Sequence, residues 1–231
     1  MHGFRLAGRP AGDYTDELPA LRAIERVELD PRVTCFVGEN GSGKSTLVEA
    51  LAGALRLNRE GGGRTYQHAF STRATHSRLH RRIELDWAGL PPRNSFFLRA
   101  ETMFNVATHA SDGMRAVYDR PLHEQSHGES FIDVVVNRLA PNGLYLLDEP
   151  EAALSLRGQL ALMQRMHDLL EADCQFVLAT HSPVLVGFPG ARILLLDDDG
   201  LREVGYDETP QVELTRAFLE APERFLRELL A

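Results

Sequence analysis

A segment near the N-terminus, TCFVGENGSGKSTLVEALAG over residues 34–53, constrains the fold more than any other part of the chain. An unbroken apolar run at 33–37 is of the kind that forms a strand buried on both faces. A glycine-rich turn follows, and residues 44–57 then place Leu47 and Leu51 at helical spacing. The segment therefore predicts a strand, a tight turn and a helix in direct succession.

The turn has the pattern Gly-x-x-x-x-Gly-Lys-Ser of a phosphate-binding loop, in the required place between a strand and a helix. Its glycines allow backbone conformations in which successive N–H groups point at phosphate oxygens, and the new helix adds its positive end. Lys44 is predicted to reach the β- and γ-phosphates, and the Ser45 hydroxyl to ligate Mg²⁺. The predicted nucleotide contacts are Gly38, Glu39, Asn40, Gly41, Ser42, Gly43, Lys44, Ser45 and Thr46.

A second apolar strand ends in two adjacent carboxylates, within LYLLDEP over residues 144–150. Ligands of open α/β sheets bind at the carboxyl ends of the parallel strands, so these acids are expected beside the glycine-rich turn. We predict that Asp148 holds Mg²⁺ through water and that Glu149 polarises the water that attacks the γ-phosphate. For Glu149 alone, an ordinary surface acid at a strand end is the alternative.

The rest of the chain alternates short buried strands with helical stretches, which predicts an α/β fold with a mostly parallel sheet. The first 100 residues are expected to add mixed or antiparallel strands. The expected elements are strands at 20–29, 82–87, 94–100 and 174–180, helices at 129–139 and 155–172, a hairpin at 191–206, and two short helices within 210–230.

Composition limits the classes of partner. The 231 residues include 43 % hydrophobic residues, and the formal net charge is −8. That charge argues against indiscriminate binding to nucleic acid or to anionic membranes. The basic stretch at 73–82 is an exception, and is either a solvated loop or a contact surface for a phosphate backbone or an acidic partner.

Two further features concern the cellular compartment. Cys35 and Cys174 each lie in an apolar run without metal-ligand spacing, so we expect reduced thiols in the core. The sequence has no signal-peptide core and no run of 18 apolar residues. The expected location is therefore cytoplasmic.

Taken together, GENGSGKST, LYLLDEP and the histidine of LATHSP resemble the ABC-type ATPase head. The segments FFLRAE, LHEQSHGESF and LLDEPEAALS are closer still to bacterial stand-alone ATPases of the AAA or ABC-like type. The resemblance implies a P-loop NTPase fold with an antiparallel N-terminal β subdomain and a short helical segment before the signature loop. It implies one domain over 1–231, with a mixed β part at roughly 1–100 and a reduced helical part at roughly 102–140.

The resemblance also assigns roles to residues outside the two motifs. Ser126 and Gly128, in SHGES, match the signature loop that closes over ATP from a second subunit. His181 matches the switch histidine that contacts the γ-phosphate and orients the catalytic water, and Glu101 stands where a lid-loop glutamine touches the metal. The pattern departs from the family at His127 and Glu129 within the signature, at Glu101, and at Ser155, where an aspartate is usual. Tyr14 stands at the place of an adenine-stacking aromatic, although an ordinary tyrosine is the favoured interpretation there.

The function implied by the resemblance is Mg²⁺-dependent ATP hydrolysis at the interface of a head-to-tail homodimer, which drives a conformational switch on a protein or nucleic-acid client. Two alternatives stay open, the ATP-binding subunit of an ABC transporter and an ATP-sensing module with low turnover. Ser126 follows Glu101 by only 25 positions, which is short for a lobe that grips a membrane protein, so a membrane partner is expected to be unlikely. The absence of a heptad run excludes a coiled-coil arm protein.

Overall fold

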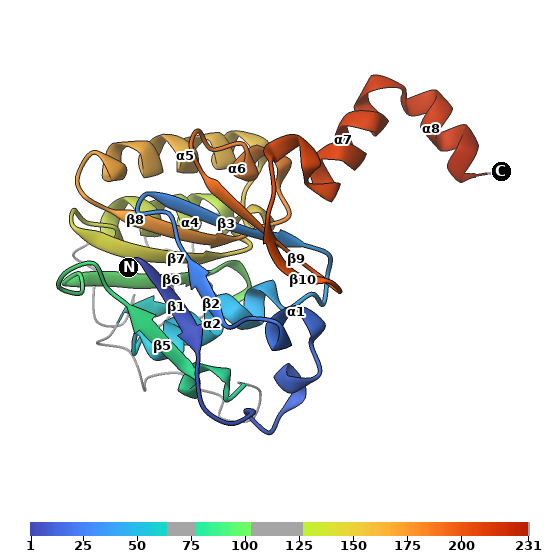
Figure 1. The fold of residues 1–231 in the computed structure, drawn as a ribbon. Coiled ribbons are helices and arrows are strands. Elements are labelled where there is room, and N and C mark those ends of the chain that lie inside the picture. The colour runs from blue at the N-terminus through green and yellow to red at the C-terminus, as the bar shows by residue number, and fades with distance from the viewer. Residues whose placement is uncertain (64–76, 103–126, 231) are drawn as a thin grey trace.

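A mixed seven-stranded sheet forms the centre of the computed structural model, which describes residues 1–63, 77–102 and 127–230 (Figure 1). The strand order is β10-β9-β3-β8-β7-β6-β4. The five central strands are parallel, and the two edge strands are antiparallel to their neighbours. The strands are β3 Val33–Gly38, β4 Gly62–Gly63, β6 Asn94–Arg99, β7 Gly143–Asp148, β8 Gln175–Ala179, β9 Arg192–Asp197 and β10 Gly200–Glu203. The predicted mostly parallel α/β sheet and the hairpin before residue 206 are confirmed.

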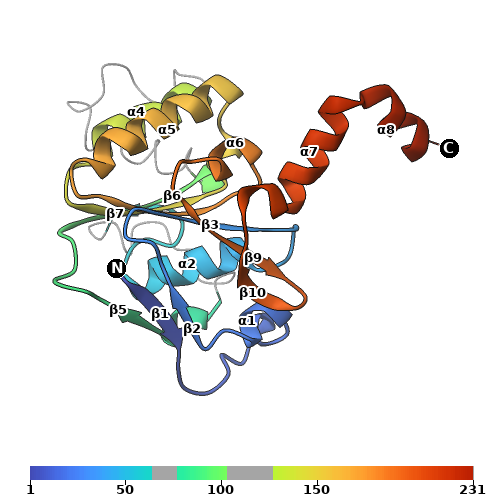
Figure 2. The same ribbon diagram turned by 45° about the horizontal axis from the view of Figure 1, so that its top comes forward.

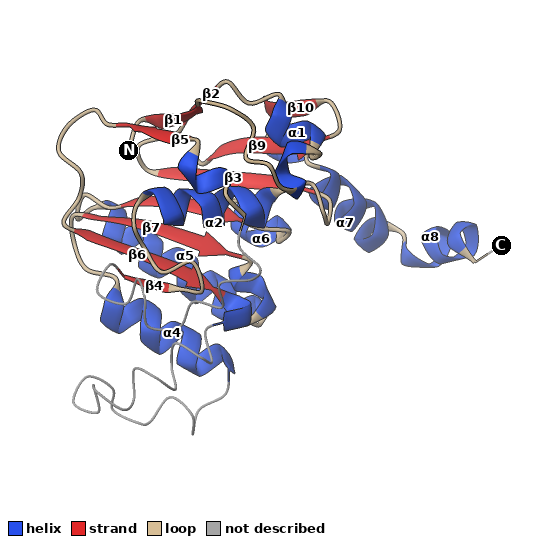
Figure 3. Ribbon diagram, turned by 90° about the horizontal axis from the view of Figure 1, so that it is seen from below, coloured by secondary structure: helices blue, strands red, loops and turns tan. Residues whose placement is uncertain are grey.

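Helices cover both faces of this sheet, and the alternation of side chains along each strand decides which face a residue serves. In β3, Cys35 faces the helices drawn above the sheet in Figure 1, whereas Phe36 faces α2 on the other side. Figure 3 shows α2 lying against that second face. The bounds are α2 Lys44–Ala54 on one face, and α4 His127–Arg138, α5 Leu156–Leu170 and α6 Pro183–Val186 on the other.

A small antiparallel sheet packs beside α2, in the order β2-β1-β5, and agrees with the antiparallel N-terminal subdomain implied by the resemblance. Its strands are β1 Gly3–Leu6, β2 Arg26–Glu28 and β5 Ile83–Asp86. The expectation of one strand over 20–29 is wrong in its first half, because α1 occupies Pro19–Arg22. Pro19 stands at the first helical position, which suits its fixed φ, and Leu21 is buried by that helix.

Short 3₁₀ turns connect several of these elements. They are η1 Tyr14–Asp16, η3 Leu79–Arg81, η4 Ala100–Thr102, η6 Pro150–Ala152 and η7 Tyr206–Glu208. Both cysteines are buried and free, as expected. No helix in the part of the chain that the structure describes is long and apolar enough to cross a membrane.

The C-terminal helices extend away from the body of the domain (Figure 2). They are α7 Pro210–Glu220 and α8 Pro222–Leu229, and they confirm the prediction of two short helices that break near Pro222. The base of α7 is attached through Val212, which is buried, whereas Leu214 is largely exposed. Only the first turns of α7 therefore lie close enough to the sheet to contribute to a site.

Candidate functional site

The candidate site lies at one edge of the large sheet, where the central parallel strands end together. Arg99 at the end of β6 is in register with Asp148 at the end of β7, and Asp148 is in register with Ala179 of β8. The glycine-rich turn leaves β3 at Gly38, beside β8 in the sheet. The carboxyl ends of parallel strands are the usual ligand-binding edge of open α/β sheets, so the topology brings the predicted motifs together.

The glycine-rich turn has the backbone that its sequence predicts. Gly38, Gly41 and Gly43 have φ values of 146°, 82° and 102°, a region that disfavours side chains. A Cβ on Gly38 would lie 2.2 Å from the carbonyl oxygen of Leu196, so a glycine is required there for steric reasons as well. Gly43 is the N-cap of α2, and the helix therefore begins at Lys44 with its N–H groups facing the turn.

Lys44 is turned back into the loop. Its Nζ donates to the carbonyl oxygen of Glu39 at 2.8 Å, and the residue is only 3 % exposed. Burial lowers the pKa of Lys44, and the carboxylates of Glu149 and Asp148 partly offset that shift. The ammonium group therefore lies within the cradle of backbone groups, where it can contact a phosphate without first being desolvated.

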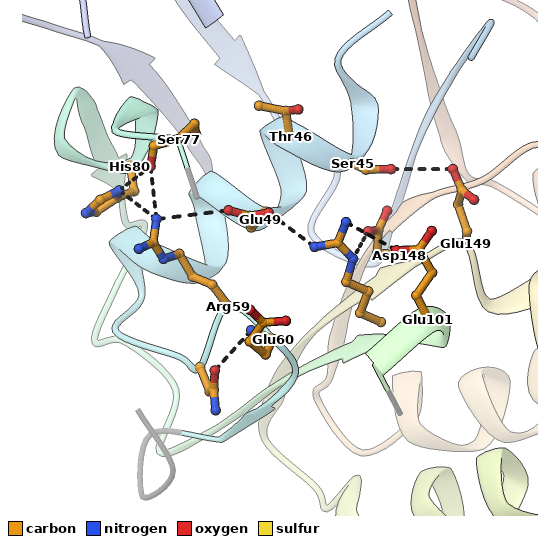
Figure 4. Close-up of polar contacts among 12 residues, drawn as sticks. Ser45, Thr46, Glu49, Arg59, Glu60, Ser77, His80, Glu101, Asp148 and Glu149 are labelled. Carbon is orange, nitrogen blue, oxygen red and sulfur yellow. Dashed lines mark hydrogen bonds and ion pairs between the residues drawn. The ribbon is translucent and has the colours of Figure 1, made fainter. Parts of the chain in front are cut away.

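Asp148 and Glu149 follow β7 with different environments. Asp148 is 3 % exposed, and burial raises its pKa to about 6, although the Ser45 hydroxyl and the Arg99 guanidinium lower it. Glu149 has a φ of 48°, an uncommon value for a residue with a side chain, and its N–H donates to the carbonyl oxygen of Ala179. The Ser45 hydroxyl donates to Glu149 Oε1 at 3.4 Å, as Figure 4 shows.

The residues around Asp148 fit a magnesium ion. Asp148 Oδ1 is buried and has no hydrogen-bond partner, whereas Oδ2 lies 3.3 Å from Arg99 Nε. A carboxylate and the Ser45 hydroxyl are the hard oxygen ligands that Mg²⁺ prefers, and this ion usually takes its other ligands from water and substrate phosphates. The described residues contain no group of three His, Cys, Asp or Glu side chains placed to hold a metal.

We expect Asp148→Asn to stabilise the nucleotide-free protein at neutral pH. Because the folded pKa is about 6 and the unfolded value is about 4, the folded protein binds this proton more tightly. Ionised Asp148 therefore destabilises the fold above pH 6, and the penalty disappears as pH falls towards 4. Urea unfolding in EDTA should show a gain of ~1–3 kcal/mol at pH 7.5 that shrinks towards pH 4. Asp198→Asn, in the exposed β9–β10 turn, is the matched control, and a pH-independent effect of Asp148→Asn would contradict the expectation.

His181 reaches the same site from the end of β8. Its Nε2 lies 3.6 Å from Glu149 Oε1 and is buried without a hydrogen-bond partner. Glu151 fixes the backbone behind it, because its carboxylate accepts from the His181 N–H at 2.5 Å and from the Thr180 hydroxyl at 2.8 Å. Ser182 then caps α6 through Val184 and Leu185 N–H groups. The histidine is thus anchored on a short, tightly bonded corner that faces Glu149.

The other residues assigned through the resemblance lie at the edge of the site, in neighbouring elements, or outside the described residues. Glu101 is at the site edge, 71 % exposed, with its Oε2 3.6 Å from Arg99 Nη2. Gly128 lies in the first turn of α4, and Ser126 lies outside the described residues. Ser155 is the N-cap of α5 and accepts from the Gly158 N–H, so a helix cap occupies the place of the usual aspartate. Tyr14 is half exposed, and its hydroxyl lies 3.3 Å from Thr46 Oγ1 beside the start of α2.

Three contributions to the site were not anticipated from the sequence. Arg99 contacts Asp148, Glu151 holds the His181 corner, and α7 closes one side. A cavity of about 500 Å³ lies between the glycine-rich turn and α7, lined by Gly38, Glu39, Asn40, His181, Pro210, Gln211, Glu213, Leu214 and Ala217. The position of Arg99, two residues before Glu101 at the end of a buried strand, could have indicated that it belongs to the site. The contribution of α7 has no local signal, because it depends on where the tail returns to the sheet.

Two family profiles match separate parts of the chain. Residues 21–81 match the family described as "AAA domain", and residues 106–187 match one described as "AAA domain, putative AbiEii toxin, Type IV TA system". The first includes the glycine-rich turn, and the second includes the strand that ends in Asp148 and the His181 corner. The matched segments therefore contain the motifs that the fold brings to one edge.

Curated relatives cover most of the chain. The zinc import ATP-binding protein ZnuC of Alkalilimnicola ehrlichii is 30 % identical over 185 residues, which is 78 % of this chain and 69 % of the relative. ZnuC of Halorhodospira halophila is 30 % identical over 211 residues, 83 % of this chain and 78 % of the relative. Among solved structures, "An inward-facing conformation of a putative metal-chelate type ABC transporter" has a TM-score of 0.53 at 18 % identity, covering 93 % of this chain and 88 % of that one.

The structural likeness supports the fold alone, whereas the sequence likeness to the two ZnuC proteins shows kinship. The sheet order, the glycine-rich turn and the acidic strand end agree with both findings. Members of this family in general bind ATP with Mg²⁺ and hydrolyse it. The chain therefore belongs to the ABC-type P-loop ATPases.

Proposed function

We propose that the chain binds and hydrolyses ATP with Mg²⁺ between two copies that associate head to tail, and that this cycle switches a protein or nucleic-acid client. The observation that carries the proposal is the convergence of Lys44, Ser45, Asp148, Glu149 and His181 at one sheet edge. Each has a chemical type that phosphoryl transfer from ATP to water requires. A purely structural cluster would not need a buried lysine, unpaired carboxylate oxygen and strained glutamate in one place.

In the proposed reaction, Lys44 and the backbone N–H groups after Gly38 bind the β- and γ-phosphates. Ser45 and Asp148 would hold a Mg²⁺ ion, which would supply positive charge beside the phosphate oxygens. Glu149 Oε1, which lies between the Ser45 hydroxyl and His181 Nε2, orients and polarises the attacking water. His181 fixes the position of that water and contacts the γ-phosphate. Glu101 would supply a further oxygen ligand for that ion.

The second copy is proposed to complete the site. Ser126 and the Gly128 N–H of one copy would bind the γ-phosphate held by the other, so each ATP is enclosed by both. Such reciprocal contacts generate a two-fold interface. Loss of the γ-phosphate after hydrolysis removes a contact that both copies share, and the dimer loosens.

We expect the ATPase rate to depend on the square of protein concentration when the protein is dilute. A monomer lacks the contacts that Ser126 and Gly128 of a second copy would supply, so turnover should rise as dimers form. Phosphate release measured over a 100-fold dilution series, with albumin added against surface losses, checks this. A constant rate per protein molecule across the whole series would contradict the dimer proposal while leaving ATP hydrolysis itself intact.

A transport role is the second candidate, and the comparisons favour it more than the sequence reasoning did. Both ZnuC relatives are named as ATP-binding proteins for zinc import, which runs against our expectation that a membrane partner is unlikely. Under this alternative, the same ATP-dependent dimer would drive a separate membrane protein. Co-purification with an integral membrane protein would support it. Salt-sensitive stimulation of the ATPase by DNA or RNA, lost when Arg78, Arg81 and Arg82 are neutralised, would support a nucleic-acid client instead.

A further inference from the structure

Arg99 lies among three carboxylates that come from three different elements. Its Nε is 3.3 Å from Asp148 Oδ2, its Nη1 is 3.2 Å from Glu49 Oε2, and its Nη2 is 3.6 Å from Glu101 Oε2. Figure 4 shows the three carboxylates, those of Glu49, Asp148 and Glu101, in the neighbourhood of Ser45 and Glu149. A planar fork of donors suits such an arrangement, whereas a lysine could satisfy fewer of these partners.

The three contacts differ in burial, and the difference indicates what each one does. The side chains of Asp148, Glu49 and Arg99 are 3 %, 11 % and 21 % exposed, so water screens these pairs weakly. Glu49 follows Ser45 by four residues on α2 and therefore faces the same side of the helix. Glu49 thus holds the Arg99 guanidinium from α2. Arg99 in turn contacts Oδ2 of Asp148 and leaves the other oxygen, Oδ1, unpaired.

A purely structural role of Arg99 would not explain its contact with Glu101. Glu101 is 71 % exposed in the protein without nucleotide, where an ion pair of this kind contributes little. A bound triphosphate would bring further negative charge to an edge that already holds Glu101, Asp148 and Glu149 beside Lys44. The charge of Glu101 would then oppose binding unless a cation lies beside it.

We propose that Arg99 is a positioning residue of the nucleotide site, which balances the charge of Glu101 and holds Asp148 by one oxygen so that the other faces Ser45. The proposal rests on the proposed function, because it assigns Arg99 a role in ATP binding. It predicts that Arg99 and Glu101 act as a pair: removal of the cation is harmful only while the carboxylate is present. A residue that simply ties β6 to α2 and β7 would not behave in this way.

Binding of a fluorescent ATP analogue in EDTA tests the pair without any contribution from a metal. We expect Arg99→Met to weaken binding about tenfold, and Glu101→Gln in the same chain to restore it to within about threefold of the wild type. Glu101→Gln alone should bind the analogue more tightly than the wild type in EDTA, because it removes a negative charge and no metal is present for Glu101 to ligate. Arg5→Met, which removes an exposed ion pair to Glu84 on the small sheet, is the matched control and should change nothing.

The possible results distinguish a failure of the proposed function from a failure of the Arg99–Glu101 pairing alone. If the wild type binds the analogue neither in EDTA nor with Mg²⁺, the proposed function fails. If the wild type binds and the double variant stays as weak as Arg99→Met, the pairing of Arg99 with Glu101 is wrong and the guanidinium has only a structural role. Thermal melting identifies a variant that does not fold. Should Arg99→Met fail that check, Arg99→Lys with and without Glu101→Gln replaces it, with a smaller loss and the same rescue expected.

Discussion

Glu149→Gln should lower ATP turnover by at least about 100-fold while leaving ATP binding intact. The amide keeps the size of the side chain and its contact with Ser45, but it cannot polarise water as a carboxylate does. ATP should therefore persist in the site and hold two copies together. Phosphate release measures the first effect, and size-exclusion chromatography with ATP and Mg²⁺ measures the second, as a shift from monomer to dimer that ADP does not produce.

A matched control is available in Glu84→Gln, which alters an exposed glutamate of β5 on the small sheet and should leave both readouts unchanged. Turnover above half of the wild-type rate in Glu149→Gln would show that another group activates the water. An ATP-dependent dimer in both proteins, combined with negligible turnover already in the wild type, would instead support the ATP-sensing module. Turnover thus tests the role of Glu149, and the two readouts together test whether the protein is an active ATPase or an ATP-sensing module.

The parts of the fold that were predicted correctly depend on local patterns. The glycine-rich turn and the acidic strand end can be recognised from the sequence because a few adjacent residues determine their backbone geometry and charge. Both motifs sit on strands that are apolar throughout, a pattern typical of strands covered on two faces. The carboxyl ends of parallel strands share one edge of the sheet. The proximity of Lys44 to Asp148 and Glu149 could therefore be predicted from the sequence once parallel strands were assumed.

The parts that were missed depend on contacts between distant segments. Residues 20–29 mix polar and apolar side chains, as an exposed strand can, yet a helical turn that buries Leu21 against the core occupies the first half. Arg99 and Glu49 are 50 residues apart, and only the packing of β6 beside α2 shows that they pair. The approach of α7 to Glu39 likewise follows from the path of the tail after β10. No local pattern encodes these distances.

Lys44→Met should weaken ATP binding by about 100-fold, because the ammonium group is the cation within the phosphate cradle. In the protein without nucleotide, its Nζ is already held by the carbonyl oxygen of Glu39, so little rearrangement is needed for it to meet a phosphate. Fluorescent-analogue titration measures the loss, and thermal melting checks that the variant folds. Lys44→Arg keeps the charge in a bulkier group, and we expect an intermediate affinity because the loop around this buried position is tight.

Lys44 also offers a test that needs no substitution, because it is the only lysine in the chain. Protein labelled with ¹³C-lysine therefore gives a single lysine Cε signal, whose shift against pH reports the pKa of this one group. Burial should hold that pKa below the ordinary lysine value in the nucleotide-free protein, even though Glu149 and Asp148 pull it upward. Added ATP brings negative charge to the ammonium group and should raise the pKa. A lysine signal that titrates like free lysine and ignores ATP would place Lys44 in solvent, away from any phosphate, and would contradict both the described geometry and its role in binding.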